Sequence, residues 1–242
     1  MKKVFITGGT GSVGRVFVKR FSAEGYDVLF QYHSHRQIAD EIAAESGARP
    51  YHGDYIADRA VLPETGIEIL INCAAINISS SQAADVTDVE WASTMAVNLH
   101  APFALIREAL PAMERRGFGR IINVGSIYSL RAVERNLPYT VSKHGLSAIT
   151  KTVAREYGAR GITSNEICPG PIRSRLMNEV AQRKAATVHV KPEDYLEQLS
   201  RSIPTHRLAE ADDVSSVALF LASDGAGYVN GISLVVDGGM TI

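Results

Sequence analysis

Two side chains with complementary chemistry, Tyr139 and Lys143, are separated by one helical turn in the sequence. On a helix this spacing places a phenol and an ammonium group on the same face. The cation favours the phenolate and lowers the pKa of the phenol from about 10. A tyrosine tuned in this way can exchange a proton with an alcohol or a carbonyl near neutral pH. Because this spacing is common by chance, a solvent-facing helix pair is the alternative interpretation.

A second candidate site is the glycine-rich stretch from Thr7 to Gly14, which follows an apolar run and opens a helical pattern. Glycines let the backbone turn tightly and approach a pyrophosphate, and the helix N-terminus presents free N–H groups to it. Gly9, Gly11 and Gly14 also match the spacing of the dinucleotide fingerprint. The stretch therefore predicts a dinucleotide site, with a simple glycine-rich turn as the alternative.

The segment after the second apolar run bears on which dinucleotide binds. NAD enzymes of this type carry an acidic residue about 20 residues beyond the glycines. Here no acidic residue lies between Asp27 and Asp40, whereas His33, His35 and Arg36 are present. The missing carboxylate favours NADP over NAD. A solvated Arg36 beside two histidines of a polar loop is the alternative.

The elements that must position these residues alternate between strand and helix. Continuous apolar runs of strand length indicate a parallel sheet that is covered on both faces, and intervening helical patterns imply a doubly wound α/β fold. We expect strands at 4–7, 28–32, 67–72, 120–124, 163–167 and 232–236. We expect helices at 12–24, 37–46, 138–157 and from 88 to about 116, the last with a kink at Pro102. Ligands of such folds bind beyond the carboxyl ends of the strands, where both candidate sites fall.

Composition restricts the class of protein further. The chain has 242 residues and a formal net charge of −1, so a single domain is expected and no broad field attracts nucleic acid or an anionic membrane. The apolar run at the N-terminus is far too short for a signal peptide, and no stretch approaches a membrane span. Cys73 and Cys168 are expected to be buried free thiols. These features predict a cytoplasmic protein.

Together the motifs resemble the short-chain dehydrogenase/reductase family over the whole chain. The residues that carry the resemblance are the glycine stretch, Asp54, Asn72-Cys73-Ala74-Ala75, Asn98, Ser126, Tyr139-Thr140-Val141-Ser142-Lys143, the segment from Asn165 to Ser174, Phe220 to Ser223, and Val236 to Gly239. Three departures from the family pattern involve four positions. Ser12 occupies the place of a loop glycine, Cys73 and Ala75 replace Asn and Gly, and Glu166 is unusual in its strand.

The resemblance implies a Rossmann fold and a mechanism. Ser126 and Tyr139 would hydrogen-bond the substrate oxygen, with Tyr139 exchanging the proton. Lys143 would hold the nicotinamide ribose and stabilise the phenolate, and Asn98 would anchor a water that connects Lys143 to solvent. The implied cofactor-binding set is Gly8, Thr10, Gly11, Ser12, Val13, Gly14, His33, Arg36, Asp54, Asn72, Ala74, Ala75, Tyr139, Lys143, Pro169, Gly170, Ile172 and Ser174.

The substrate is less strongly indicated. Enoyl reductases of the family have their tyrosine seven positions before the lysine, where this chain has Asn136, so carbonyl chemistry is favoured. The resemblance is strongest to 3-oxoacyl-[acyl-carrier-protein] reductases, whereas sugar, polyol and small-ketone dehydrogenases share the same sequence style. Basic residues in and near a helical lid expected at 173–207 would suit an anionic substrate, or are solvated surface charges. Tyr128, Leu130, Met177 and Tyr195 would line the pocket or serve only in packing.

Three further expectations concern the class and assembly of the protein. A cofactor-sensing regulator without turnover is the rival class, and the presence of Asn98, Ser126, Tyr139 and Lys143 favours an enzyme. The histidines show no metal-ligand spacing, so no catalytic metal is expected. The family implies a homotetramer or dimer, acting on a small-molecule or carrier-linked carbonyl substrate.

Overall fold

Seven parallel strands form one sheet in the order β3-β2-β1-β4-β5-β6-β7. The computed structural model describes residues 1–79 and 81–242. The strands are β1 (Lys3–Ile6), β2 (Asp27–Tyr32), β3 (Arg49–His52), β4 (Ile69–Asn72), β5 (Gly119–Val124), β6 (Ile162–Pro169) and β7 (Ser233–Val236). The predicted doubly wound α/β fold is confirmed. The strand order reverses between β1 and β4, and such a reversal opens a ligand crevice at the carboxyl ends of the strands.

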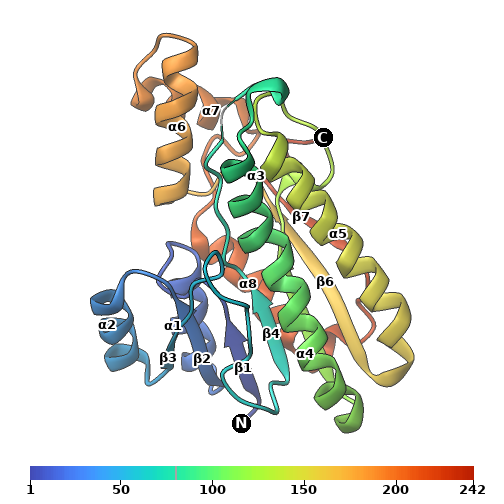
Figure 1. Ribbon diagram of the computed structural model, residues 1–242. Helices are drawn as coiled ribbons and strands as arrows, with labels where there is room; N and C mark the ends of the chain where they lie inside the picture. The colour runs from blue at the N-terminus through green and yellow to red at the C-terminus, as the bar shows by residue number, and fades with distance from the viewer. Residues whose placement is uncertain (80) are drawn as a thin grey trace.

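Helices cover both faces of this sheet (Figure 1). One face carries α1 (Gly14–Ala23), α2 (Arg36–Ser46) and α8 (Ala211–Ala222), and the other carries α3 (Asp88–Met95), α4 (Ala101–Arg116) and α5 (Leu137–Tyr157). Two further helices, α6 (Arg175–Thr187) and α7 (Pro192–Ser202), stand beyond the carboxyl ends of the strands. Short 3₁₀ turns occupy Ala83–Asp85 (η1), Ile127–Ser129 (η3), Gly158–Arg160 (η4) and Asp224–Ala226 (η5).

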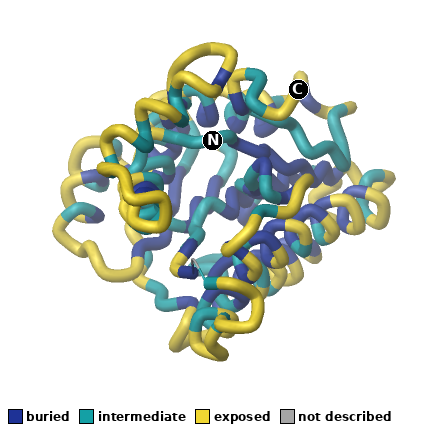
Figure 2. Tube along the Cα trace, turned by 90° about the horizontal axis from the view of Figure 1, so that it is seen from above, coloured by how far each residue is buried: buried dark blue, intermediate teal, exposed yellow. Residues whose placement is uncertain are grey.

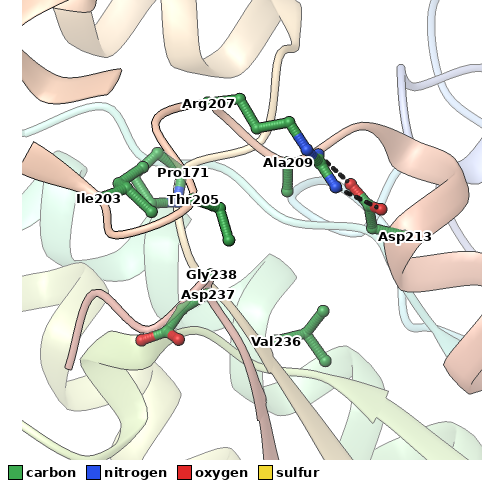
Figure 3. Close-up of a pocket in the computed structure, with 9 residues that line it drawn as sticks. All are labelled: Pro171, Ile203, Thr205, Arg207, Ala209, Asp213, Val236, Asp237 and Gly238. Carbon is green, nitrogen blue, oxygen red and sulfur yellow. Dashed lines mark hydrogen bonds and ion pairs between the residues drawn. The ribbon is translucent and has the colours of Figure 1, made fainter. Parts of the chain in front are cut away.

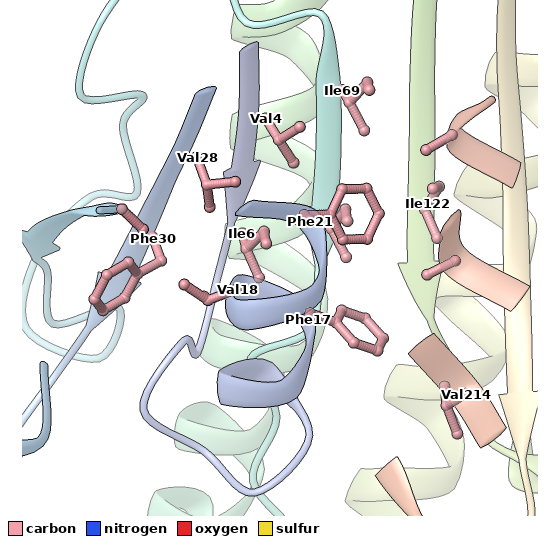
Figure 4. Packing of buried hydrophobic residues seen from close by; sticks show 14 of the residues in the cluster. Val4, Ile6, Phe17, Val18, Phe21, Val28, Phe30, Ile69, Ile122 and Val214 are labelled. Atoms are coloured by element: carbon pink, nitrogen blue, oxygen red, sulfur yellow. The ribbon is translucent and has the colours of Figure 1, made fainter. Parts of the chain in front are cut away.

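The apolar faces of the helices close the core. On the α1 face, Phe17 and Phe21 pack with Val4 and Ile6 of β1 (Figure 4), and none of these four side chains is exposed. Full burial of each such side chain contributes about 1.5–3 kcal/mol. Figure 2 shows the buried chain at the centre of the molecule and the exposed chain around the helices outside. The sheet is therefore a rigid base for the loops at its carboxyl edge.

Two parts of the fold differ from the sequence-based expectation. The long helix expected from residue 88 is irregular near Pro102, and the irregularity is a π-helical turn, η2 (Ala96–His100), that ends two residues before the proline and joins α3 to α4. The ranges of β3 and α8 were not predicted, because the residues of β3 are mostly exposed and carry no apolar run.

Candidate active site

The first turns of α5 bring Tyr139 and Lys143 to the end of β5. Pro138 lies in the first turn of the helix, where its fixed φ favours helix initiation. Lys143 is only 1% exposed, and its Nζ donates a hydrogen bond of 2.7 Å to the carbonyl of Val124. The same nitrogen lies 5.5 Å from the centre of the Tyr139 ring. The two side chains share one face of the helix, as the spacing predicts.

Ser126 is held beside this pair by the η3 turn. Its Oγ accepts a hydrogen bond from the Tyr128 amide at 3.1 Å, while its own amide donates to Ser129 Oγ at 3.2 Å. The reciprocal bonds form a capping box that fixes the backbone immediately after β5. A hydrogen bond also joins the side chains of Ser126 and Tyr139. One hydroxyl and one phenol therefore converge on the same point.

The protonation of the pair differs from the sequence-based expectation. Burial raises the pKa of Tyr139, and this effect exceeds the lowering by the hydrogen bond from Ser126. Burial also lowers the pKa of Lys143 to about 8. The predicted lowering of the Tyr139 pKa is wrong for this arrangement, because Lys143 directs its Nζ to the Val124 carbonyl. Tyr139 is thus a neutral phenol at physiological pH and is suited to donate a proton.

Asn98 is positioned by the π turn. Its Oδ1 accepts from the Ile76 amide, and its Nδ2 donates to the Ile76 carbonyl, both at 2.9 Å. The same Nδ2 donates to Ser142 Oγ at 3.2 Å, and Ser142 in turn donates to the Tyr139 carbonyl at 2.7 Å. Asn98 therefore joins the loop after β4 to the catalytic helix. The structure brings all four predicted catalytic residues into one site.

The glycine stretch forms a cradle with no room for side chains. Gly8 has a φ of 69°, and a Cβ on it would lie 2.9 Å from Ala74 Cα. A Cβ on Gly14 would collide with the carbonyl of Gly8. The N-terminus of α1 has no side-chain cap at Val13, and the positive end of its helix dipole lies at the cradle. This cradle fits a dinucleotide pyrophosphate.

Two buried side chains that the sequence analysis did not select support this cradle. Thr7 Oγ1 accepts from the amides of Cys73 and Ala74 at 3.0 and 2.9 Å. Gln31 Oε1 accepts from the Gly8 amide at 2.9 Å, and its Nε2 donates to the Gly53 carbonyl at 2.5 Å. A polar side chain near the end of each apolar strand was the available signal. Both residues fix loops that the predicted ligand would touch.

The loop after β2 places its cations at the edge of the cradle. Arg36 is the first residue of α2, whose N-terminus has no side-chain cap. His33 Nε2 lies 3.3 Å from Asp54 Oδ2. Hydrogen bonds from the amides of Ile56 and Ala57 lower the pKa of Asp54. His35 Nε2 lies 3.3 Å from Arg175 Nη1, which reaches across from α6. Arg36 Nε lies 3.7 Å from Asp40 Oδ2 and both side chains are exposed, so the charges of this edge are paired and open to solvent.

The remaining residues of the predicted cofactor set lie at the ends of β4 and β6. Asn72 is buried below the floor of the crevice and donates to Asn123 Oδ1 at 2.8 Å. Ala74 lies against Gly8, and Ala75 follows it. Past β6, the Gly170 amide donates to the Val236 carbonyl at 3.0 Å, and Ser174 caps α6 by accepting from the Met177 amide. Thr10 and Gly11 continue the cradle, and the Ser12 hydroxyl accepts from the Arg175 amide at 3.1 Å.

The residues that lead into α6 and those that follow α7 lie close to the C-terminal end of β7 (Figure 3). Ile172 pairs with Ala209 in an isolated bridge, and Ala209 exchanges backbone hydrogen bonds with Pro171 and Arg173. A cavity of about 120 Å³ lies beside this bridge, and the bidentate Arg207–Asp213 ion pair forms part of its wall. None of the four predicted catalytic residues lines the cavity. It lies beside the residues that lead into α6 and follow α7, away from the predicted catalytic residues.

Most arginines of this region are paired with acidic neighbours. Arg173 pairs with Glu210, Arg175 with Glu179, Arg201 with Glu197 and Arg207 with Asp213. These pairs support the solvated-surface interpretation of those arginines. Closer to the site, Tyr128 packs edge-on against Tyr139 with ring centres 6.1 Å apart. Burial is the largest cause that raises the pKa of Tyr128, and the neighbouring Tyr195 of α7 raises it further. Tyr195 therefore lies near Tyr128, at the mouth of the site.

Cys73 and Cys168 are free thiols, as predicted, but only Cys168 is buried as expected, whereas Cys73 is partly exposed. Over residues 1–79 and 81–242, no cluster of His, Cys, Asp and Glu side chains could hold a metal ion. Within the same described residues, no helix is both long and apolar enough to cross a membrane.

Comparison with known proteins places this site among oxidoreductases. A short-chain dehydrogenase/reductase family model described as enoyl-(acyl carrier protein) reductase matches residues 8–241. A D-beta-hydroxybutyrate dehydrogenase of Rhizobium meliloti (strain 1021) is 31% identical, over 99% of this chain and 98% of its own. An acetoacetyl-CoA reductase of the same organism is also 31% identical, over 97% and 96%. An actinorhodin polyketide ketoreductase crystallised with NADPH matches with a TM-score of 0.91 and 26% identity, over 99% and 97%.

Proposed function

The chain belongs to the short-chain dehydrogenase/reductase family, and we propose that it uses NADPH to reduce a carbonyl group to a secondary alcohol. The observation that carries this proposal is the convergence of Ser126 and the neutral phenol of Tyr139 beside the buried Lys143. A protonated phenol is the form that gives a proton to a carbonyl oxygen, as reduction requires.

The cofactor would lie along the carboxyl edge of the sheet. The glycine cradle and the N-terminus of α1 would hold the pyrophosphate. His33 and Arg36 would hold the 2′-phosphate, and Asp54 the adenine. The loop from Pro169 through Gly170 and Ile172 to Ser174 would receive the nicotinamide. When bound, the nicotinamide supplies the hydride.

The side chains of this protein supply orientation and a proton. The Ser126 hydroxyl and the Tyr139 phenol both hydrogen-bond the carbonyl oxygen and hold the carbon at a fixed position. Tyr139 donates its proton to that oxygen as negative charge develops there. The Lys143 ammonium then stabilises the phenolate and holds the ribose hydroxyls. Asn98 maintains the spacing between the loop after β4 and α5.

Carbonyl reduction is favoured over reduction of a carbon–carbon double bond, although the matching family model is described as an enoyl reductase. The position seven residues before Lys143 is Asn136, which lies immediately before α5 and is 3% exposed. A buried amide there has no ionisable proton to give. The relatives described above as a hydroxybutyrate dehydrogenase and an acetoacetyl-CoA reductase both interconvert a carbonyl and an alcohol, as their names state.

The substrate that we propose is a 3-oxoacyl thioester. The names of the two bacterial relatives support a short 3-oxo or 3-hydroxy acid derivative. The lid at 173–207, with Tyr195 near Tyr128, would cover the reacting group and exclude water. A sugar, polyol or small ketone is the alternative substrate, and these would be distinguished in the same assay.

The test is oxidation of NADPH by the purified protein in the presence of an acetoacetyl thioester, with NADH in a parallel reaction. We expect rapid loss of NADPH absorbance and a much slower loss of NADH absorbance. Oxidation of neither cofactor, with NADPH still bound, would reject the thioester and redirect the assay to small ketones, sugars and polyols. NADPH binding without turnover of any carbonyl would favour a regulator.

We also propose that the protein is a homotetramer or a dimer in the cytoplasm. Phe103 on α4, Val141 on α5 and Phe220 on α8 are exposed apolar side chains on helices of both faces. Such side chains are expected at subunit contacts. Light scattering at several protein concentrations would measure the assembly state.

A further inference from the structure

A row of polar side chains crosses the sheet directly below the active site. Asn72, Asn123, Glu166 and Ser233 are register partners on the adjacent strands β4, β5, β6 and β7. Asn123 Nδ2 donates to Thr150 Oγ1 of α5 at 2.8 Å, so the row faces the catalytic helix. Glu166 is the one ionisable member of the row, and it is completely buried.

The Glu166 carboxylate is held by hydroxyl groups on both sides. Its Oε1 accepts from Ser129 Oγ at 2.7 Å, and its Oε2 accepts from Ser233 Oγ at 2.8 Å. A Cβ added to Gly125 would collide with this carboxylate, so the group fills the space beneath the turn after β5. Both carboxyl oxygens of Glu166 therefore have a hydroxyl partner, which satisfies this buried group.

The first bond reaches the catalytic serine. Ser129 gives its hydroxyl proton to Glu166, so its lone pairs are free to accept from the Ser126 amide at 3.2 Å. Glu166 therefore holds the Ser129 hydroxyl where it accepts the hydrogen bond that fixes the Ser126 backbone. A chain of two hydrogen bonds links the buried carboxylate to the residue that would orient the substrate oxygen.

The carboxylate also acts on Lys143. Lys143 Nζ donates to the Val124 carbonyl, and a Cβ on the next residue, Gly125, would meet the Glu166 carboxylate, so the two groups lie close together. Burial lowers the pKa of Lys143, and Glu166 opposes this effect. The other titratable groups that face Lys143 are Cys73 on the β4 side, Cys168 on β6 and Tyr139 on α5. Burial raises the pKa of each thiol to about 12 and also raises that of Tyr139, so these groups are neutral at physiological pH. A buried cation without a compensating charge would lose its proton.

We propose that Glu166 is a positioning residue for the carbonyl reduction: it fixes the Ser126 backbone through Ser129 and provides the buried negative charge that keeps Lys143 protonated. The catalytic consequence rests on the proposed function. The electrostatic part does not, because it concerns the charge of Lys143 whatever the substrate.

The decisive variant is Glu166→Gln, which keeps the shape of the side chain and removes its charge. The ionisation of Lys143 would be followed by the ¹³C NMR signal of its labelled ε-carbon as pH rises, with the signal assigned by its loss in Lys143→Arg. We expect the pKa of Lys143 to fall by about one unit from its wild-type value, since desolvation then acts unopposed. An unchanged midpoint would overturn the electrostatic part.

Two neutral substitutions provide the matched controls. Ser233→Ala removes one hydrogen bond of Glu166 but keeps its charge, so the Lys143 midpoint should stay at the wild-type value. Ser129→Ala also keeps the charge but breaks the link to Ser126, so kcat should fall about tenfold without a shift of the midpoint. An unchanged kcat in Ser129→Ala would overturn the positioning part. A midpoint that shifts equally in Ser233→Ala and Glu166→Gln would show that hydrogen bonding, not charge, sets the ionisation of Lys143, and would overturn the electrostatic part.

The two controls keep the proposal testable if Glu166→Gln does not fold. In that case Glu166→Asp, which keeps the charge but shortens the side chain, should lose kcat as Ser129→Ala does and retain a Lys143 midpoint near that of the wild type. A midpoint lowered as far as expected for the charge-free variant would contradict the proposal. The NMR titration needs neither cofactor nor substrate, so a wild-type enzyme that reduces no thioester would refute the proposed function alone.

Discussion

The two ends of the proposed cofactor crevice are built in opposite ways. At the chemical end, Lys143, Ser142 and Asn98 are each at most 1% exposed, and each makes a hydrogen bond to a neighbouring backbone or side chain. At the phosphate end, the side chains of Arg36 and Arg175 are 82% and 72% exposed. One end is an interior and the other is a surface.

This difference predicts how each end responds to substitution. In the interior, the loss of one partner leaves another buried polar group unsatisfied, which costs about 1–3 kcal/mol. On the surface, water and salt replace a lost partner, and single ion pairs contribute only about 0–1 kcal/mol. Chemistry should therefore depend steeply on single residues, whereas cofactor choice should depend on several weak contacts.

Replacement of Tyr139 by phenylalanine gives the largest expected effect. The variant removes the one proton donor that faces the substrate oxygen and keeps the ring that packs against Tyr128. We expect kcat to fall by about 10³-fold or more. NADPH binding, measured by fluorescence titration, should change little and serves as the control for folding. Turnover near the wild-type rate would disprove the assigned role of Tyr139.

Replacement of Asn98 by alanine comes next. The substitution leaves the amide and carbonyl of Ile76 without partners and releases Ser142 from the loop after β4. We expect kcat to fall by about 10²-fold, and the free energy of unfolding in urea to fall by about 2–3 kcal/mol. Asn98→Asp, which retains the acceptor for the Ile76 amide, should recover part of the stability. If alanine changed neither quantity, the π turn would not be held by this side chain.

The sequence predicted the chemical end well because its signals are local. Tyr139 and Lys143 are one helical turn apart, and the glycine stretch is continuous, so each could be read without knowledge of the fold. The alternation of apolar runs with helical patterns likewise predicted the doubly wound sheet. An irregularity near Pro102 was expected, whereas its form, a π-helical turn at Ala96–His100, was not predicted.

What the sequence could not predict depends on register across the sheet. Glu166 was noticed only as an unusual residue, because its partners Ser129 and Ser233 are distant in the chain and meet it only once β6 pairs with its neighbours. The hydrogen bond between Gln31 and the Gly8 amide could not be predicted for the same reason, because the two residues belong to different strands and the loops that follow them. The expected lowering of the Tyr139 pKa failed because burial, which spacing does not reveal, outweighs the other effects.

Replacement of Arg36 by alanine tests the phosphate end. Removal of this cation from the N-terminus of α2 should raise the KM for NADPH about fivefold, a loss of about 1 kcal/mol, and leave the KM for NADH and kcat nearly unchanged. Lys19→Ala is the matched control, because Lys19 is another exposed cation of this face and pairs with Glu45 of α2. An equal change in the KM for NADPH and for NADH, or an equal change in the Arg36→Ala and Lys19→Ala variants, would contradict a 2′-phosphate contact at Arg36.

Replacement of Arg175 by alanine gives the smallest expected effect and sharpens the comparison most. Its guanidinium lies between Glu179 and His35, whereas its amide holds Ser12 and is unaffected by the substitution. Because the side chain is exposed and already paired, we expect only about a twofold rise in the KM for NADPH, and that rise should vanish at high salt. Arg201→Ala, which removes a similarly exposed arginine paired with Glu197 on α7, should have no effect on this KM. A tenfold or salt-independent rise in Arg175→Ala would mean that this arginine becomes buried against the cofactor. The phosphate end would then share the steep dependence on single residues that characterises the chemical end.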